Sequence, residues 1–84
     1  MYEIKIKKKL DGFIDSLENS ENIRNKLLDL RYFNSRKVHL DIVRVKGKKK
    51  NLYRLRIGRL RFLFEVLESM IIVKMGDYRG SVYS

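Results

Sequence analysis

The chain has 84 residues, of which 44% are hydrophobic and 11% aromatic, which is enough for one small domain, residues 1–84, with a modest core. It has no cysteine and a single histidine, which excludes disulfides and thiolate metal sites, argues against zinc or iron, and fits a reducing, cytoplasmic setting. Its 20 lysines and arginines against 10 acids give a net charge of +10, which predicts a surface that attracts polyanions, nucleic acid first.

The first third of the chain predicts a strand followed by two helices. From residue 2 to 7, apolar and charged side chains alternate at the two-residue period of a strand. Over residues 8–18 the apolar positions recur at the helical period, which is typical of a helix with one buried stripe. A second helix begins at Asn19 or Ser20, either of which can cap it, and its apolar stripe covers residues 23–33. The short connection makes the two helices antiparallel.

The middle of the chain contains one ambiguous segment and one basic loop. Residues 38–45 suit a strand by the alternation of Val38, Leu40 and Ile42, and suit a helix by other spacings. Their β-branched side chains favour extended structure. Residues 46–51 are predicted to form a solvated loop whose lysines add to any phosphate-binding surface beside it. These lysines are Lys46, Lys48, Lys49 and Lys50.

Residues 52–66, LYRLRIGRLRFLFEV, alternate apolar and cationic side chains, so they have one apolar and one basic face. Gly58 permits a tight turn between the two halves, which are predicted to pair as an antiparallel hairpin. Outward cations on a half-buried strand often serve only solubility. Arginine rather than lysine, with few acids nearby, favours bidentate phosphate contacts instead. The arginines gathered on this face are Arg54, Arg56, Arg59 and Arg61.

The chain ends with an apolar run, residues 70–75, and the tail GDYRGSVYS. The run is predicted to be the last strand, near the sheet centre. The ordered set YRLRIG, RLRFLFEV, an apolar strand and MGDYRGSVY resembles the RelE/ParE toxin superfamily. The resemblance implies an α+β fold with an N-terminal strand, a two-helix antiparallel hairpin and a three- to four-stranded antiparallel sheet, in the order β-α-α-β-β-β. The residue patterns described above predict the same topology independently.

Carried over residue by residue, the resemblance implies a catalytic set of Arg61, Arg79 and Tyr83. Arg61 occupies the place of the phosphate-stabilising arginine, Arg79 that of the second arginine, and Tyr83 that of the tyrosine in the closing valine-tyrosine pair. Arg54 and Arg56 stand where the ribosome-dependent members often carry lysines. Because arginine remains protonated, neither can act as a general base, and proton transfer falls to Tyr83 or to no residue.

The chemistry of RNA cleavage without a metal can be compared with these residues. It needs a deprotonated 2′-hydroxyl, a stabilised phosphate and a protonated leaving oxygen, and arginines suit the second task. Tyr83 can be the base if nearby cations lower its pKa, can stack on an RNA base, or can be a packed anchor. We assign His39 a surface or capping role and Tyr53 and Tyr78 structural roles. No acidic cluster is spaced to hold a divalent ion, so we expect neither metal nor cofactor.

The resemblance implies a toxin of a toxin–antitoxin system, an mRNA interferase that inhibits translation. Such an endoribonuclease cleaves mRNA in the ribosomal A site, so its partners are the ribosome and mRNA. ParE-like members inhibit DNA gyrase and others only bind RNA, and these two alternatives stay open because fold does not decide function. Either toxin function implies an acidic or amphipathic antitoxin, usually encoded next to it. We expect no membrane partner, since no apolar run approaches the roughly 20 residues of a span and no signal peptide or interfacial helix is evident.

Overall fold

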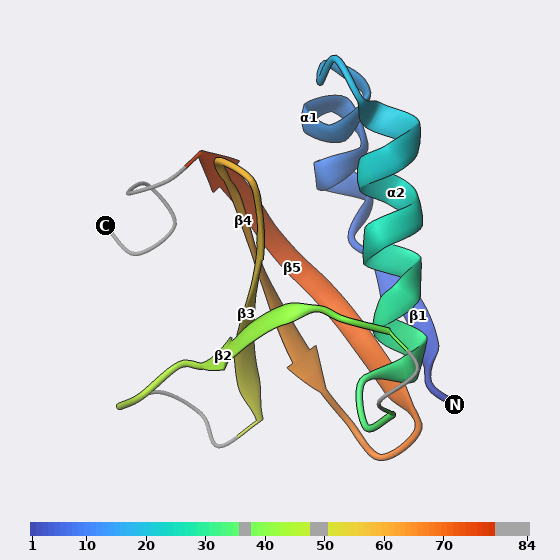
Figure 1. The fold of residues 1–84 in the computed structure, drawn as a ribbon, viewed down its shortest axis with the longest axis vertical. Coiled ribbons are helices and arrows are strands. Elements are labelled where there is room, and N and C mark those ends of the chain that lie inside the picture. Colours follow the sequence, from blue (N-terminus) through green and yellow to red (C-terminus); the bar gives the residue numbers. More distant parts are fainter. Residues whose placement is uncertain (36–37, 48–50, 79–84) are drawn as a thin grey trace.

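The computed structural model describes residues 1–35, 38–47 and 51–78 as a layer of helices on one side of a twisted sheet (Figure 1). Its elements in chain order are β1 (Glu3–Ile6), η1 (Lys8–Leu10), α1 (Asp11–Asp15), α2 (Ser20–Leu28), η2 (Asp29–Tyr32), β2 (Asp41–Arg44), β3 (Leu52–Ile57), β4 (Leu60–Val66) and β5 (Met70–Tyr78). None of the helices in these ranges is long and apolar enough to cross a membrane. The α+β class predicted from the sequence is confirmed.

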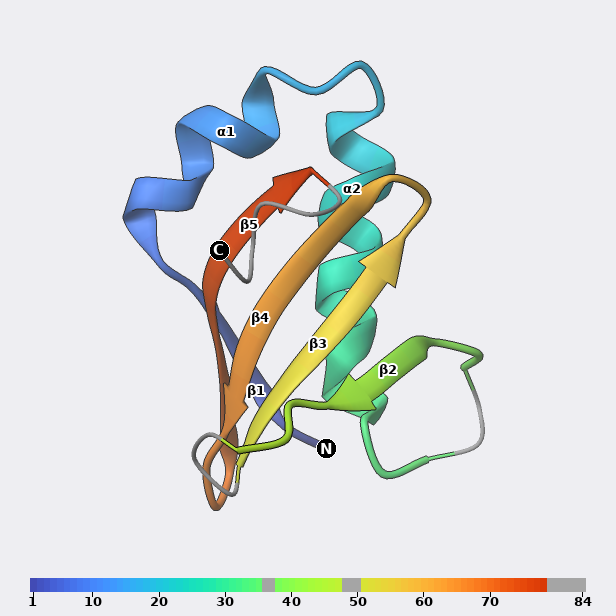
Figure 2. The ribbon, with the colours of Figure 1, turned by 90° about the vertical axis from the view of Figure 1, so that its left-hand side faces the viewer.

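Five strands form one sheet in the order β1-β5-β4-β3-β2. Strands β2 to β5 are antiparallel neighbours, which confirms the predicted four-stranded antiparallel part, and β1 pairs parallel with β5 at the edge. The ambiguous segment 38–45 contains β2 and no helix, so the expected extended structure is confirmed for Asp41–Arg44. β5 is an interior strand, as its continuous apolar run predicts, and it continues past residue 75 to Tyr78. When the opposite face is viewed directly, α2 lies behind β3 and β4, and α1 lies beyond the end of β5 (Figure 2).

The two helices are shorter than the sequence pattern predicts. The helix expected over residues 8–18 starts with a 3-10 turn and ends at Asp15, and the Ser16 hydroxyl donates a hydrogen bond of 2.7 Å to the carbonyl of Phe13. Serine competes with helical hydrogen bonding in this way, and Gly12 weakens the same turn. α2 begins at Ser20 with Asn19 at its N-cap position, as predicted, but the Asn19 side chain makes no capping hydrogen bond.

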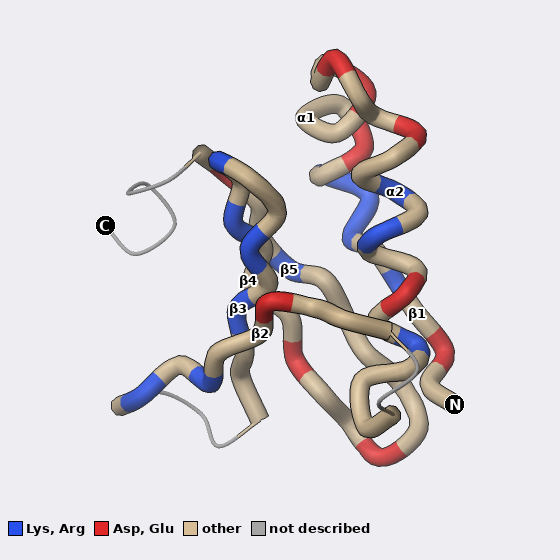
Figure 3. The backbone as a smooth tube through the Cα atoms, viewed as in Figure 1, with Lys and Arg blue, Asp and Glu red and all other residues tan. Residues whose placement is uncertain are grey.

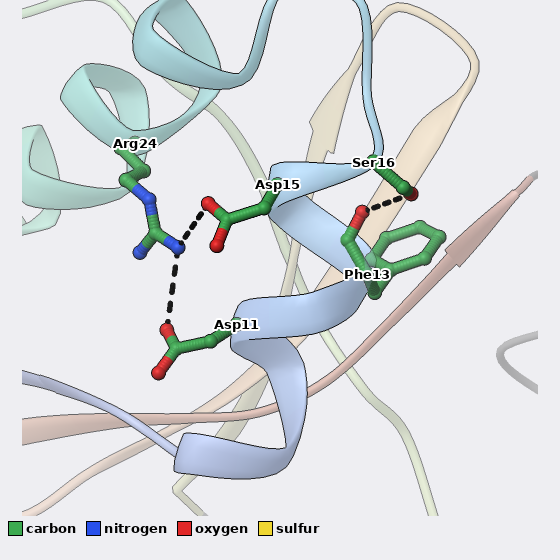
Figure 4. Close-up of polar contacts among 5 residues, drawn as sticks. All are labelled: Asp11, Phe13, Asp15, Ser16 and Arg24. Atoms are coloured by element: carbon green, nitrogen blue, oxygen red, sulfur yellow. Dashed lines mark hydrogen bonds and ion pairs between the residues drawn. The ribbon is translucent and has the colours of Figure 1, made fainter.

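Arg24 joins α2 to α1 (Figure 4). Its Nη2 donates to Asp15 Oδ1 at 2.8 Å and to Asp11 Oδ1 at 3.3 Å. The hydrogen bond to Asp15 is the largest cause of a raised Arg24 pKa, against an opposing effect of desolvation. The three side chains are 33% to 66% exposed, so solvent screening limits the stabilisation from such pairs to about 0–1 kcal/mol. The two carboxylates therefore link the helices and are already engaged by a cation.

The core lies between the helices and the inner face of the sheet. It consists of Leu10, Ile14, Ile23, Leu27, Leu30, Leu55, Leu60, Phe62, Phe64, Ile71 and Val73. Leu55 on β3 and Phe62 and Phe64 on β4 come from the apolar face of the alternating stretch 52–66. The predicted division of that stretch into two faces is therefore confirmed for the strands, where Arg54, Arg56 and Arg61 lie on the side opposite the core, but not for Arg59, which lies in the turn.

Gly76 allows β5 to pass against the buried ring of Phe62, its cross-strand partner. A Cβ at Gly76 would lie 2.5 Å from Phe62 Cε1 and 2.6 Å from Cδ1. We expect Gly76→Ala to destabilise the fold by about 1–3 kcal/mol, because the ring must move within a packed core. Urea-induced unfolding measures this change.

Gly12→Ala is the matched control, because a Cβ at this helical glycine meets nothing within 4 Å. It is expected to raise the free energy of unfolding by about 0.5–1 kcal/mol. Equal stability of the Gly76→Ala variant and the parent chain would contradict the close approach at Gly76.

Candidate nucleic-acid interface

The side of the sheet turned away from α2 is here called the outer face (Figure 2). By strand register and burial, it carries the arginines of β3 and β4. Arg54 and Arg56 flank buried Leu55, and Arg61 lies between buried Leu60 and Phe62, so the three arginines share the face opposite the core. Arg56 and Arg61 are direct cross-strand partners. Their Cβ atoms are therefore about 4.5–5.5 Å apart, and both side chains can reach one phosphate.

Register arranges the outer face into two rows that run across β2, β3, β4 and β5. The charged row is Asp41, Arg56, Arg61 and Asp77, and the row beside it consists of Val43, Arg54, Leu63 and Met75, in which Arg54 is the one charged residue. In the charged row the two cations occupy the middle and the two acids the ends. Figure 3 shows basic positions following one another along β3 and β4, whereas acidic positions gather around α1 and the start of α2.

Hydrogen bonds and burial restrict the arginines. Arg56 Nε donates to Asp41 Oδ2 at 2.7 Å, with the two side chains 54% and 46% exposed. The Nε atoms of Arg54 and Arg61 are buried, so the stems of these side chains lie against the sheet. Asp77, opposite Arg61 in register, accepts the backbone N–H of Tyr78 at 2.7 Å. The guanidinium groups are therefore held at the surface and do not extend loosely into solvent.

Solved structures share this architecture. A chain of the RelB-RelE antitoxin-toxin complex from Methanococcus jannaschii is similar with a TM-score of 0.73 and 26% identity, and the match covers 94% of each chain. This chain has the RelE-like toxin fold. A copper-bound mutant toxin from Helicobacter pylori is similar with a TM-score of 0.72 and 15% identity, covering 98% of this chain and 99% of that one.

A conserved hypothetical protein from Helicobacter pylori is similar with a TM-score of 0.56 and 18% identity, and the match covers 98% of this chain and 99% of that one. These two Helicobacter pylori proteins support the RelE-like fold alone. No family model matches the sequence, and a search of curated proteins gives no match. The resemblance drawn from the arginine strands and the tail is thus confirmed as a RelE-like fold.

Several residues expected at the RelE-like site lie elsewhere on the chain. Arg59 is exposed in the β3–β4 turn beside Gly58, whose φ of 58° fits the predicted tight turn. Lys46 is exposed in the turn after β2. Five predicted residues fall outside the described ranges: Arg79, Tyr83, Lys48, Lys49 and Lys50.

The two tyrosines expected to be structural both contact other aromatic rings. Tyr53 stacks on Phe64 with ring centroids 5.7 Å apart and an interplanar angle of 18°. Tyr78 meets Phe13 edge-on at 5.9 Å, although its side chain is partly exposed. His39 is exposed just before β2. None of these three residues lies in either row of the outer face.

The expectation that few acids lie near the arginines is wrong, because two aspartates close the charged row. Asp41 is 15 residues from Arg56 in the chain, yet pairs with it directly. The sequence did hold a signal for the face on which Asp41 lies. Ile42 packs against the core, so alternation along the strand places its neighbour Asp41 on the outer face. Within the described residues, no group of three or more His, Asp or Glu side chains could hold a metal ion.

Five hollows on the described surface are lined by residues other than Arg54, Arg56 and Arg61. One lies between the N-terminus, η2 and the β4–β5 turn and is lined by residues that include Tyr2, Tyr32 and Glu68. Another lies between the helix connection and the β3–β4 turn. The arginines instead occupy an open face, which suits a polymer that lies across the strands better than a small molecule that needs an enclosing pocket.

Proposed function

We propose that this chain is the toxin of a toxin–antitoxin system and acts in the cytoplasm as a ribosome-dependent mRNA interferase. The observation that carries the proposal is the cluster of Arg54, Arg56 and Arg61 on the open outer face of a RelE-like fold. The likeness to a chain of an antitoxin–toxin complex supports the toxin role and a cognate antitoxin as partner. An acidic or amphipathic antitoxin would cover the cations of this face.

The proposed reaction is attack by the 2′-oxygen of the RNA on the adjacent phosphorus. The 2′-hydroxyl gives its proton to a base, the bond from phosphorus to the 5′-oxygen breaks, and that oxygen takes a proton from water, leaving a cyclic phosphate upstream and a 5′-hydroxyl downstream. Arg61 and Arg56, opposite each other on β4 and β3, would stabilise the negative charge that develops on the phosphate oxygens. Arg79 as a second phosphate ligand and Tyr83 as the base rest on the resemblance to the family.

RNA binding by this face is expected to weaken steeply with salt. Each phosphate neutralised releases counterions, so about six contacts to single-stranded RNA would reduce affinity by roughly 300-fold between about 50 and 200 mM salt. Fluorescence anisotropy with a short single-stranded RNA measures the slope. Replacing Lys48, Lys49 and Lys50 together with Gln should reduce the slope and weaken all sequences about equally, because such contacts do not read bases. An affinity that hardly changes with salt would contradict an electrostatic interface.

Expression in a bacterial host, with and without the neighbouring open reading frame, tests the function itself. We expect growth inhibition that the second gene relieves, together with new mRNA 5′ ends inside coding regions. A parallel supercoiling assay with purified gyrase tests the ParE-like alternative. If mRNA stays intact and gyrase is inhibited, the chain is a gyrase inhibitor and the proposed function is wrong.

A further inference from the structure

The charged row places two like charges at directly opposing positions of adjacent strands. Such a pair destabilises a sheet when nothing offsets the repulsion. Here Asp41 on β2 and Asp77 on β5 stand beyond the two arginines, so the order of charges across the sheet is acid, base, base, acid. An added anion is therefore stabilised most by the charges of this row when it lies between Arg56 and Arg61.

Asp41 contacts Arg56 in a particular way. Its carboxylate accepts the Nε–H at 2.7 Å, which is the one hydrogen bond found between the Arg56 side chain and the described residues. An arginine has five N–H donors, so the four on Nη1 and Nη2 remain for a ligand. These are the donors of the planar fork that recognises phosphate. A long side chain held before the ligand arrives loses less freedom on binding.

We propose that Asp41 is a positioning residue, which holds Arg56 so that its guanidinium and that of Arg61 meet the same phosphate. The inference rests on the proposed function and adds a role that the arginines alone do not supply. Asp41 also repels the RNA backbone, since its carboxylate is 46% exposed. It therefore weakens overall RNA binding while it improves the geometry of the reacting phosphate.

The other acids of the outer face have different partners. Asp77 Oδ1 accepts the backbone N–H of Tyr78 at 2.7 Å. Glu65 pairs with Lys74 at 3.1 Å and accepts a hydrogen bond of 3.3 Å from Asn51. Glu65 is thus a carboxylate on the same sheet that pairs with a lysine, which makes it a control for the loss of one negative charge, although its side chain is 15% exposed and that of Asp41 46%.

The test compares Asp41→Asn, Asp41→Glu and Glu65→Gln with the parent chain. Affinity is measured with a short single-stranded RNA, and the cleavage rate is measured at saturating protein on mRNA-programmed ribosomes. Asp41→Asn is expected to bind RNA as tightly or more tightly and to cleave at least about tenfold more slowly. Asp41→Glu should recover part of the rate, and Glu65→Gln should keep it.

Two outcomes would overturn the inference. Tighter binding with faster cleavage by Asp41→Asn would mean that Asp41 acts only as a repelling charge. Loss of binding and rate together with a lower melting temperature would mean that it is structural.

If the parent chain cleaves no mRNA, the proposed function fails, and NMR of the Arg56 Nε–H still tests the positioning. We expect this proton to exchange slowly in the parent, to exchange fast in Asp41→Asn, and to shift when inorganic phosphate is added. An unchanged exchange rate in the Asn variant would refute the positioning role.

Discussion

Arg61→Lys is expected to slow mRNA cleavage by about 10²-fold or more while the chain stays folded. Lysine keeps the charge and most of the stem but lacks the planar fork that can bind two phosphate oxygens at once. The buried Nε of Arg61 indicates that the stem packs against the outer face, so lysine preserves packing better than alanine. Single-turnover cleavage on programmed ribosomes measures the loss, and thermal unfolding should shift by less than about 4 °C.

Arg44→Lys is the control for this substitution. Arg44 lies on β2, and its position alternates with those of Asp41 and Val43, so it belongs to the opposite face from the charged row. Its replacement should leave the cleavage rate near that of the parent. A normal rate for Arg61→Lys, or a loss that is explained by a large fall in melting temperature, would contradict the role given to Arg61.

Phe62→Ala is expected to destabilise the fold by about 3–5 kcal/mol, because it leaves a cavity in the centre of the core. Phe62 is 0% exposed, lies opposite Gly76 and meets Phe13 edge-on at 6.3 Å. Domains of this size have only about 5–15 kcal/mol of stability in total. Circular dichroism should show a melting temperature lowered by more than about 10 °C, or an unfolded chain.

Phe62→Leu tests whether the destabilisation comes from the cavity. Leucine keeps more of the side-chain volume than alanine, so Phe62→Leu should lower the free energy of unfolding by less than Phe62→Ala. Leu63, the next residue along β4, belongs to the outer face and lies outside the core cluster. An unchanged melting temperature for Phe62→Ala would mean that the apolar face of the alternating stretch is not the one buried beneath the helices.

The sheet faces could be predicted because burial on a strand has a period of two, whichever strand becomes its partner. Leu55, Phe62 and Phe64 follow this rule without knowledge of the neighbours. The parallel pairing of β1 with β5 could not be predicted in the same way, because Ile4 and Ile71 are far apart in the chain and alternation carries no information about direction. Pairing depends on the fold as a whole.

In the first helix, the apolar positions were predicted correctly but the end of the helix was not. The period over residues 8–18 correctly places Leu17 against the core, but the backbone leaves the helix after Asp15. Ser16 offers the backbone carbonyl of Phe13 an alternative donor, and short helices gain little from each added hydrogen bond. The packing pattern is therefore more robust than the exact length of the element that supplies it.

Part of the candidate site could be predicted from local alternation, and part depends on how the strands pair. The hairpin pattern around Gly58 was sufficient to predict that Arg54, Arg56 and Arg61 share a face. The place of Asp41 beside Arg56 was not predicted, because it depends on the register of β2 against β3, which local alternation leaves undetermined. The assignments to Arg79 and Tyr83 remain predictions that rest on the family resemblance.

The most direct test of the account is the chemistry of the cut on ribosomes programmed with a defined mRNA. The account predicts an upstream fragment that ends in a cyclic phosphate, and no cut when the sugar at that position is 2′-deoxy, because the attacking hydroxyl is then missing. A chelator should have no effect provided that the magnesium which holds the ribosome together is kept. Cleavage of the 2′-deoxy mRNA, or uncut mRNA alongside inhibited gyrase, would contradict it.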